Sequence, residues 1–406
     1  GEAVMTADKF SKYMYDLIDR VVSTIGPREP CSEAELKAAD MMAEEFKPMC
    51  DAVKVEPFTC SPTAFLGFLP ISVILYIIAA GLYWVFAPAA LFFALVGFVM
   101  LFFEFMRYKE FVDFLFPKKT SKNVLGVIKP RGEVKRRLIV CGHMDSAYEF
   151  NLFLLLKNGA VVLMIIGVLA TLILLGASIA KTIAYFNGTA DARIYVIFGA
   201  ISIGLYPILG LFLQFHSYHP VPGAMDDMAG VAVAAGLGKY LSDAKQNGGF
   251  VPQHTEVVLY AAGCEEAGLR GAKRYVAAHK QELLQTPTTA LIYDGVYDEK
   301  FLTVITREIC TGAKHDKKLV NAVIDIAKKR NMPIRKRLVP FGASDSSVFS
   351  LAGISSTCIL CQDVDTLVPN YHTRFDTVEK IRPEALAVSL QVAVDMLEKI
   401  DAEAGG

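Results

Sequence analysis

The sequence predicts an α/β protein with a mostly parallel, mixed sheet sandwiched by helices and with four inserted transmembrane helices in two hairpins. Short β-branched apolar runs alternate with segments of helical periodicity, which is typical of a sheet covered on both faces. The composition is also unusually apolar, with 53% hydrophobic and 20% charged residues. Soluble domains have about 45–50% and about 25%.

The excess of apolar residues lies in two regions. Residues 64–103 contain no Asp, Glu, Lys, Arg or His, and Pro88 lies near the middle. Residues 158–180 and 194–215 are uncharged as well. Because about 20 apolar residues cross a bilayer, each region predicts a helical hairpin. Buried helices of a large soluble core are the alternative, but soluble helices average only about 10–14 residues and seldom lack charge over such lengths.

These hairpins divide the chain into five segments. We expect N-terminal helices of the soluble domain in 1–63, hairpin 1 in 64–106, more of the soluble domain in 107–150, hairpin 2 in 151–215, and the remainder of the soluble domain in 216–406. A hairpin returns the chain to the side that it left, so all soluble segments should share one compartment.

Charge and cysteine usage predict which compartment this is. Five basic residues crowd the return from the first hairpin: Arg107, Lys109, Lys118, Lys119 and Lys122. By the positive-inside rule the soluble domain of this multi-pass protein should be cytoplasmic. The eight cysteines lack the spacing of a disulfide scaffold, which suits a reducing compartment. The net charge of −1 predicts no nucleic-acid partner.

Within the soluble segments, strands and helices can be placed by pattern. Strands are expected at 137–142, 256–263, 290–296 and 355–360, and helices at 230–245, 271–284, 317–329 and 383–400. Ser32 and Glu35 have the spacing of a capping box at the start of a further helix.

Polar residues follow three of the predicted strands. His143 and Asp145 follow the first, Glu265 and Glu266 the second, and Asp294 lies at the end of the third. In such sheets the working residues collect at the carboxyl ends of the strands. Taken singly, a histidine or a carboxylate there is more often a turn or cap residue. Together they predict a site at one edge of the sheet.

Five motifs carry a family resemblance. "HMD" at 143–145, "GAMDDMAG" at 223–230, "CEEAGLRG" at 264–271, "YDG" at 293–295 and "YHTRFDT" at 371–377 occur in this order. The chain resembles the co-catalytic, di-zinc aminopeptidases, a family that also includes glutamate carboxypeptidases, glutaminyl cyclases and membrane-inserted members. The resemblance covers essentially all of the chain outside the hairpins and implies a zinc-exopeptidase type of sheet.

The resemblance also implies a set of ligands for two Zn²⁺ per chain. Asp226 would bridge both ions, His143 and Asp294 would complete one site, and Glu266 and His372 the other. His and carboxylate ligands suit Zn²⁺, and three per ion leave a position for water. The bridging Asp of this family commonly precedes a cis peptide, so we expect Asp226-Asp227 to be cis.

Three further residues receive catalytic roles by resemblance. Glu265 would be the general base, and Asp145 would hold His143 in orientation. Tyr371 would donate a hydrogen bond to the oxyanion, although a packing role fits it equally well.

The resemblance implies a metallopeptidase. Together with the predicted hairpins, the leading expectation is a membrane-anchored zinc exopeptidase with aminopeptidase activity. Alternatives are an amidohydrolase or carboxypeptidase on lipid-linked or N-acyl amino acid substrates, a glutaminyl cyclase with one zinc ion, and a non-catalytic membrane scaffold. The expected partners are the membrane and a peptide or amide substrate. If the site lies near the bilayer, this substrate can be hydrophobic or lipid-linked. Frequent Gly and Ala in the spans would permit an oligomer.

Several remaining residues carry weaker expectations. His216 and His219 should pack where the second hairpin ends. His254, His279 and His315 are expected to be solvated. In "GASDSSVFSLAGI", Ser346 takes the place of a His that is frequent in the family, which puts substrate contacts in doubt. Cys264 is expected to be a small buried residue.

Overall fold

The computed structural model describes residues 6–366 and 369–406, and the chain divides into two compact units. Unit 1 comprises Gly1–Pro62, Lys118–Tyr148 and His219–Gly406, and unit 2 comprises Thr63–Pro117 and Glu149–Tyr218. Each unit therefore contains segments that are distant in sequence.

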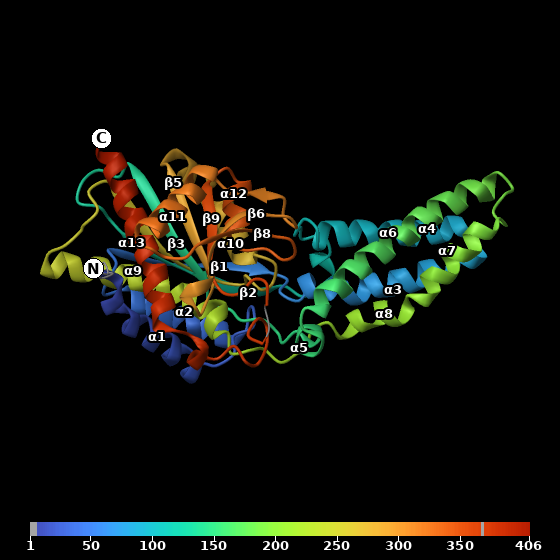
Figure 1. Ribbon diagram of the computed structural model, residues 1–406, viewed down its shortest axis with the longest axis horizontal. Helices are drawn as coiled ribbons and strands as arrows, with labels where there is room; N and C mark the ends of the chain where they lie inside the picture. Colours follow the sequence, from blue (N-terminus) through green and yellow to red (C-terminus); the bar gives the residue numbers. More distant parts are fainter. Residues whose placement is uncertain (1–5, 367–368) are drawn as a thin grey trace. The chain divides into compact units, whose positions relative to one another are not determined.

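Unit 1 is built on a nine-stranded sheet (Figure 1). Its strands are β1 (Ala52–Cys60), β2 (Lys119–Ile128), β3 (Arg136–His143), β4 (Thr255–Ala262), β5 (Thr288–Val296), β6 (Leu302–Glu308), β7 (Ala313–Lys314), β8 (Arg335–Val339) and β9 (Ser355–Cys361). Their order is β1-β2-β4-β3-β5-β9-β6-β7, with β8 paired to β6. The four central strands are parallel, and antiparallel pairs flank them. The predicted mixed α/β fold is confirmed.

Helices cover both faces of this sheet. The helices of unit 1 are α1 (Ser11–Thr24), α2 (Glu33–Phe46), α9 (Ala229–Asn247), α10 (Arg270–Gln285), α11 (Lys317–Lys329), α12 (Ser346–Leu351) and α13 (Pro383–Gly405). Leu138 and Val140 of β3 join the core with α1, α2, α9, α11 and α13. Ile139 and Cys141 join the core with α10 and α12. Successive strand residues point to opposite faces, which is why residues 138–141 of this central strand are all apolar.

Two glycines allow α9 to approach the sheet closely. A Cβ on Gly142 of β3 would lie 2.2 Å from the backbone nitrogen of Val231, and one on Gly230 would lie 2.3 Å from the carbonyl oxygen of Tyr293. Only residues without a side chain fit there. The N-terminal end of α9 is thereby held against the carboxyl ends of β3 and β5.

The predicted capping box at Ser32 forms only in part. The Ser32 side chain accepts the backbone N–H of Glu35 at 3.0 Å, as expected. The Glu35 carboxylate instead accepts the N–H of Cys31 at 3.0 Å and that of Cys264 at 2.8 Å. Glu35 is fully buried, so its carboxylate joins segments across the core and does not cap its own helix.

Unit 2 is helical. It contains α3 (Ala64–Val85), α4 (Ala87–Glu104), α5 (Asn151–Leu156), α6 (Gly159–Phe186), α7 (Arg193–Gly204) and α8 (Tyr206–Gly210), and its long helices lie side by side (Figure 1). Four stretches are long and apolar enough to cross a membrane: Ala64–Val85, Ala87–Glu104, Gly159–Phe186 and Arg193–Gln214. Many of their large apolar side chains are exposed, Ile74 at 53% and Val162 at 57% among them. Such a surface is suited to lipid.

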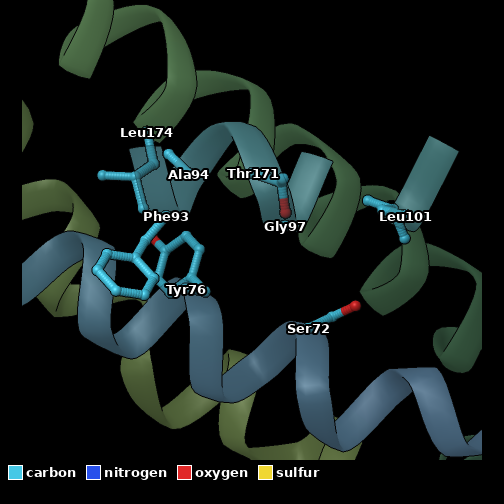
Figure 2. A pocket seen from close by; sticks show the side chains of 8 residues that line it. All are labelled: Ser72, Tyr76, Phe93, Ala94, Gly97, Leu101, Thr171 and Leu174. Carbon is cyan, nitrogen blue, oxygen red and sulfur yellow. The ribbon is translucent and has the colours of Figure 1, made fainter. Parts of the chain in front are cut away.

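Among the helices of unit 2 lies a cavity of about 20 Å³, lined by Ser72, Tyr76, Phe93, Ala94, Gly97, Leu101, Thr171 and Leu174. Figure 2 shows the Ser72 and Thr171 hydroxyls among mainly apolar neighbours. The buried Ser72 hydroxyl has no hydrogen-bond partner within residues 6–366 and 369–406, whereas Thr171 donates to Gly167 O at 3.0 Å. A water needs roughly 10–15 Å³ and polar partners. The cavity therefore has room for about one water.

Candidate active site

The carboxyl ends of three neighbouring strands bring the predicted site residues together. His143 is the last residue of β3, Glu265 and Glu266 follow β4, and Asp294 lies near the end of β5. Because β3 pairs in parallel with both β4 and β5, these residues reach the same edge. Asp226 comes from the segment before α9, and His372 from the loop after β9.

The Asp226 carboxylate lies between two histidines. Its Oδ1 is 3.1 Å from His143 Nε2, and its Oδ2 is 3.1 Å from His372 Nε2. All three side chains are at least 94% buried. The two oxygens of one carboxylate thus face two different imidazoles, which is the arrangement a bridging ligand requires.

Two overlapping groups of donor atoms share Asp226. In the first, His143, Asp226 and Asp294 offer atoms that all lie within 4.8 Å of one another, and in the second Asp226, Glu266 and His372 do. His372 Nε2 is 3.1 Å from Glu266 Oε1, and His143 Nε2 is 3.6 Å from Asp294 Oδ1. The structure therefore brings together all five predicted ligands.

Glu265 lies beside these groups. Its Oε2 is 3.5 Å from His143 Nε2, and His143, Glu265 and Glu266 also have donor atoms within 4.8 Å of one another. Glu265 is 7% exposed. Its carboxylate is thus within reach of a molecule held by the ligands.

Asp145 organises the backbone that carries both glutamates. Its Oδ1 accepts the N–H of Glu265 at 3.0 Å, and its Oδ2 accepts the N–H of Glu266 at 2.8 Å. The same Oδ1 is 3.3 Å from His143 Nδ1, which also lies 3.0 Å from Asp145 O. Asp145 therefore orients three site residues, whereas the sequence predicted an effect on His143 alone.

Two other carboxylates hold the segment that carries Asp226. Asp376 accepts the N–H of Met225 at 2.7 Å and that of Asp226 at 3.1 Å. Asp227 accepts the N–H of His143 at 3.0 Å and that of Gly230 at 3.2 Å. The Asp226-Asp227 peptide is cis, as expected. Asp376 lies inside the "YHTRFDT" motif, but its role could not be read from the sequence.

Arg28 also positions this segment and was not singled out from the sequence. Its guanidinium donates to four backbone carbonyls: Gly26 O at 2.7 Å, Met144 O at 2.7 Å, Pro222 O at 3.0 Å and Gly223 O at 2.9 Å. It is fully buried, and burial lowers the pKa of Arg28 to about 10, although Asp376 and Asp145 favour the charged form. Arg28 therefore joins the turn after α1 to the segment that follows β3 and to the segment that precedes Asp226.

The electrostatics of the site are those of crowded, buried carboxylates. Burial raises the pKa of Glu266 to about 7 and that of Asp294 to about 6, and the charge of Asp226 adds to both shifts. Burial also raises the pKa of Glu265 well above its ordinary value. Burial would lower the pKa of His372, but Glu266 and Asp226 outweigh it and raise this pKa to about 10.

This surplus of negative charge tests whether the residues fit a metal. Four carboxylates (Asp226, Glu265, Glu266 and Asp294) and two imidazoles converge in a buried region. Carboxylates so close cannot all ionise without a compensating cation. Divalent cations supply that charge, and this set of oxygen and imidazole donors suits Zn²⁺. The residues therefore fit the predicted metal.

Tyr371 stacks on a ligand. Its ring lies against that of His372, with centroids 3.8 Å apart and planes at 14°. The stacking limits rotation of His372, whose backbone has a positive φ of 51°. This contact agrees with the packing role, and it also holds the phenol next to the donor groups.

The expectation that His315 is solvated is wrong. Its side chain is fully buried, with Nε2 2.7 Å from Glu308 Oε2 and Nδ1 2.7 Å from Ser350 Oγ. Ser346, the residue that departs from the family pattern, donates to the same Glu308 oxygen at 2.9 Å. The short β7 pairs with β6 and places His315 against α12. This burial depends on tertiary contacts that the local sequence does not reveal. His279, by contrast, is 25% exposed and pairs with Glu56 at 2.7 Å.

The "GASDSS" segment contributes another buried carboxyl group. Asp345 is 1% exposed, and its Oδ1 has no hydrogen-bond partner in the part of the chain that the structure describes. Burial raises the pKa of Asp345 well above its ordinary value, and Asp294 and Asp145 add to the rise. Asp345 therefore belongs electrostatically to the site, although the sequence did not assign it a role.

Solved structures with a similar fold include aminopeptidases and glutaminyl cyclases. An aminopeptidase from Aneurinibacillus sp. strain AM-1 is 18% identical, with coverage of 97% of this chain and 95% of that one and a TM-score of 0.56. BSAP, a zinc aminopeptidase from Bacillus subtilis, is 16% identical, with 95% coverage of both chains and a TM-score of 0.55. A glutaminyl cyclase from an Acidobacteriales bacterium is 13% identical, with coverage of 97% and 95% and a TM-score of 0.56. At such identities these matches show the fold.

The family match gives the class of protein. This match and the fold together support a metallopeptidase, a hydrolase of peptide bonds. The model of Peptidase family M28 matches residues 212–397, so this part of the chain is similar to that family. This range includes Asp226, Glu265, Glu266, Asp294 and His372, and it leaves out His143 and Asp145. No curated protein matches the chain significantly. The resemblance predicted from the five motifs is thereby confirmed.

Proposed function

We propose that this protein is a membrane-anchored exopeptidase, an aminopeptidase that uses two zinc ions. One observation carries the proposal: Asp226 presents one carboxylate oxygen to His143 and the other to His372, each at 3.1 Å. With Asp294 beside the first histidine and Glu266 beside the second, two three-ligand groups share one bridge. Two bound Zn²⁺ ions would supply an activated water and polarise the scissile carbonyl.

The chain itself supplies the proton transfer. Glu265 lies beside the proposed ligands, and its backbone N–H donates a hydrogen bond to Asp145 Oδ1. Its carboxylate would accept a proton from the attacking water and deliver it to the leaving amine. Burial favours the protonated acid, so Glu265 is suited to hold the proton between these two steps. Tyr371 would donate a hydrogen bond to the oxyanion.

Two arginines near the site are inaccessible to a substrate. Arg28 donates to backbone carbonyls, and Arg270 is fully buried and donates to Gly268 O at 3.2 Å. Neither guanidinium is placed to pair with a substrate carboxylate. This supports aminopeptidase activity over carboxypeptidase activity.

The membrane anchor is the second part of the proposal. Four stretches are long and apolar enough to span a bilayer. The second hairpin is inserted in sequence between Asp145 and Asp226, and its ends are joined within unit 1, where Tyr148 pairs with Pro220 and Val221 N donates to Ala147 O at 2.9 Å. We propose that the substrates include hydrophobic or lipid-linked peptides that reach the enzyme from the bilayer.

The decisive variant is Glu265→Gln in detergent-purified protein. It should keep its zinc and lose hydrolysis of aminoacyl chromogenic substrates by about 100-fold or more. Glu133→Gln, at an exposed glutamate, is the matched control and should behave as wild type. Unchanged turnover in Glu265→Gln would refute the assignment of the base.

A substrate panel tests the specificity. Aminoacyl substrates should be cleaved and their N-acetylated counterparts should not, because acetylation removes the cationic amine. Conversion of an N-terminal glutamine to a pyroglutamyl residue with loss of ammonia, together with one zinc ion at the site, would instead indicate a glutaminyl cyclase. Peptides with and without a fatty acyl chain test the membrane route, and equal rates would leave the hairpins as anchors only.

A further inference from the structure

Three cysteines from distant parts of unit 1 meet at one point. Cys31 precedes α2, Cys60 ends β1, and Cys264 follows β4 directly before Glu265. The Sγ atom of Cys31 lies 3.7 Å from that of Cys60 and 3.4 Å from that of Cys264. All three sulfur atoms lie within 4.8 Å of one another. Neither the family match nor the predicted peptidase chemistry uses this thiol cluster.

The spacing of the sulfurs is that of metal ligands. A disulfide needs about 2.05 Å between sulfurs, far less than these separations. Around an ion with metal–sulfur bonds of about 2.3 Å, two tetrahedrally placed sulfurs are about 3.8 Å apart. The separations of 3.4 and 3.7 Å are close to this value. A disulfide uses two cysteines, whereas three sulfur atoms lie within 4.8 Å of one another here.

The surroundings differ from those of cysteines that only fill a core. Arg274 Nε donates to the carbonyl of Thr59 at 3.1 Å, which places a cation next to Cys60. Glu35 Oε1 is 3.4 Å from Cys264 Sγ, and its carboxylate also accepts the backbone N–H of Cys31 and of Cys264. A buried carboxylate that orients two of three ligands is a common partner of a metal site.

The backbone also departs from its usual conformation at two of the three positions. Cys31 has φ 62° and Cys264 has φ 51°, a region that residues other than glycine seldom adopt. Such conformations persist where the surrounding structure imposes them and collect at functional sites. Cys60 is 3% and Cys264 0% exposed, whereas Cys31 is partly exposed. An ion could enter from the side of Cys31.

We propose that Cys31, Cys60 and Cys264 form a second metal site, for one thiophilic ion of the Zn²⁺ class. Soft thiolate ligands select such ions. On binding, the thiols lose their protons to solvent as the metal–sulfur bonds form. Because Cys264 is bonded to Glu265, the ion would fix the segment that carries the proposed base to the end of β1 and the start of α2. The proposal does not depend on peptidase activity.

Cobalt substitution tests this site without measuring hydrolysis. Full-length protein, purified with reductant and stripped of metal, is titrated with Co²⁺. Thiolate ligands produce an intense near-ultraviolet charge-transfer band that imidazole and carboxylate ligands do not produce. Because the His and carboxylate site also binds Co²⁺, we read the amplitude of this band at full loading, and we expect it to correspond to one thiolate-bound Co²⁺ per chain in wild type. It should be lost in Cys60→Ser and at least tenfold weaker in binding in Cys31→Ser.

Cys50→Ser is the matched control, because Cys50 is a partly exposed cysteine outside the cluster. It should keep the band and its zinc content, whereas Cys31→Ser and Cys60→Ser should each lose about one zinc ion per chain. Circular dichroism checks folding. If Cys60→Ser does not fold, Cys31→Ser serves as the test, because Cys31 is partly exposed and its replacement should be tolerated. No thiolate band in wild type, an equal band in both cluster variants, or a disulfide found by mass spectrometry among these cysteines would overturn the proposal.

Discussion

Asp145 and Glu265 are joined by a hydrogen bond from the Glu265 N–H to Asp145 Oδ1 at 3.0 Å, and the other carboxylate oxygen accepts the N–H of Glu266. One side chain thus fixes both the proposed base and a proposed ligand. Asp145→Asn keeps the shape but replaces one acceptor oxygen with an N–H donor that faces a second N–H. We expect activity or zinc affinity to fall by about 10- to 100-fold, as measured by hydrolysis and by zinc titration.

Asp316→Asn is a suitable control for this variant. Asp316 is partly buried and caps α11 by accepting the N–H of Lys318 at 2.9 Å, while its other oxygen accepts the Ser355 hydroxyl at 2.7 Å. Its replacement therefore changes similar hydrogen bonds far from the site in sequence. Wild-type activity in Asp145→Asn would show that these hydrogen bonds do not position Glu265.

Tyr371→Phe separates the two roles of that tyrosine. The phenylalanine ring can stack on His372 as the tyrosine ring does, at 3.8 Å, but it has no hydroxyl. If the hydroxyl stabilises the oxyanion, kcat should fall by about 100-fold while KM changes little. Steady-state kinetics on an aminoacyl substrate measure both. An unchanged kcat would leave Tyr371 with packing alone.

Glu35 should make stability depend on pH. Burial, with repulsion from Asp145, raises the pKa of Glu35 from 4.5 to about 8. The folded protein therefore binds this proton more tightly than the unfolded chain, and the contribution to stability is full below pH 4.5 and is lost as the pH rises towards 8. Wild type should show a falling Tm across this range, measured in detergent with chelator present, and Glu35→Gln should show a flatter profile. Parallel profiles would contradict the buried, protonated state of Glu35.

The sidedness of the protein is tested by fusions to its C-terminal end. Five basic residues after the first hairpin predict that the soluble unit faces the cytoplasm. A green fluorescent protein fused after α13 should therefore fluoresce in cells, and an alkaline phosphatase fused at the same point should be inactive. The reverse pattern would place the soluble unit on the opposite side, and the charge argument would be wrong.

Much of the fold could be predicted because the central strands are apolar on both faces. The runs at β3, β4, β5 and β9 stand out from their neighbours, and the side chains at their ends follow from the parallel arrangement. Strand β1 is buried only at Phe58 and Cys60, and it contains Pro57. This weaker pattern explains why this antiparallel edge of the sheet was not identified.

The parts of the site that sequence reasoning missed depend on contacts between distant segments. Arg28, Glu35 and Asp376 contact residues more than 80 positions away, and no local pattern signals such a partner. The pairing of His315 with Glu308 is short in sequence but requires the turn between β6 and β7. The three thiols come from segments that only the folded sheet brings together.

The bridge at Asp226 can be tested most directly by anomalous diffraction at the zinc absorption edge from crystals of the metal-loaded protein. The proposal predicts two peaks on either side of the Asp226 carboxylate, one beside His143 and Asp294 and the other beside Glu266 and His372. A third peak among Cys31, Cys60 and Cys264 belongs to the separate thiol site. Only one peak beside Asp226, or none there, would contradict a two-zinc centre.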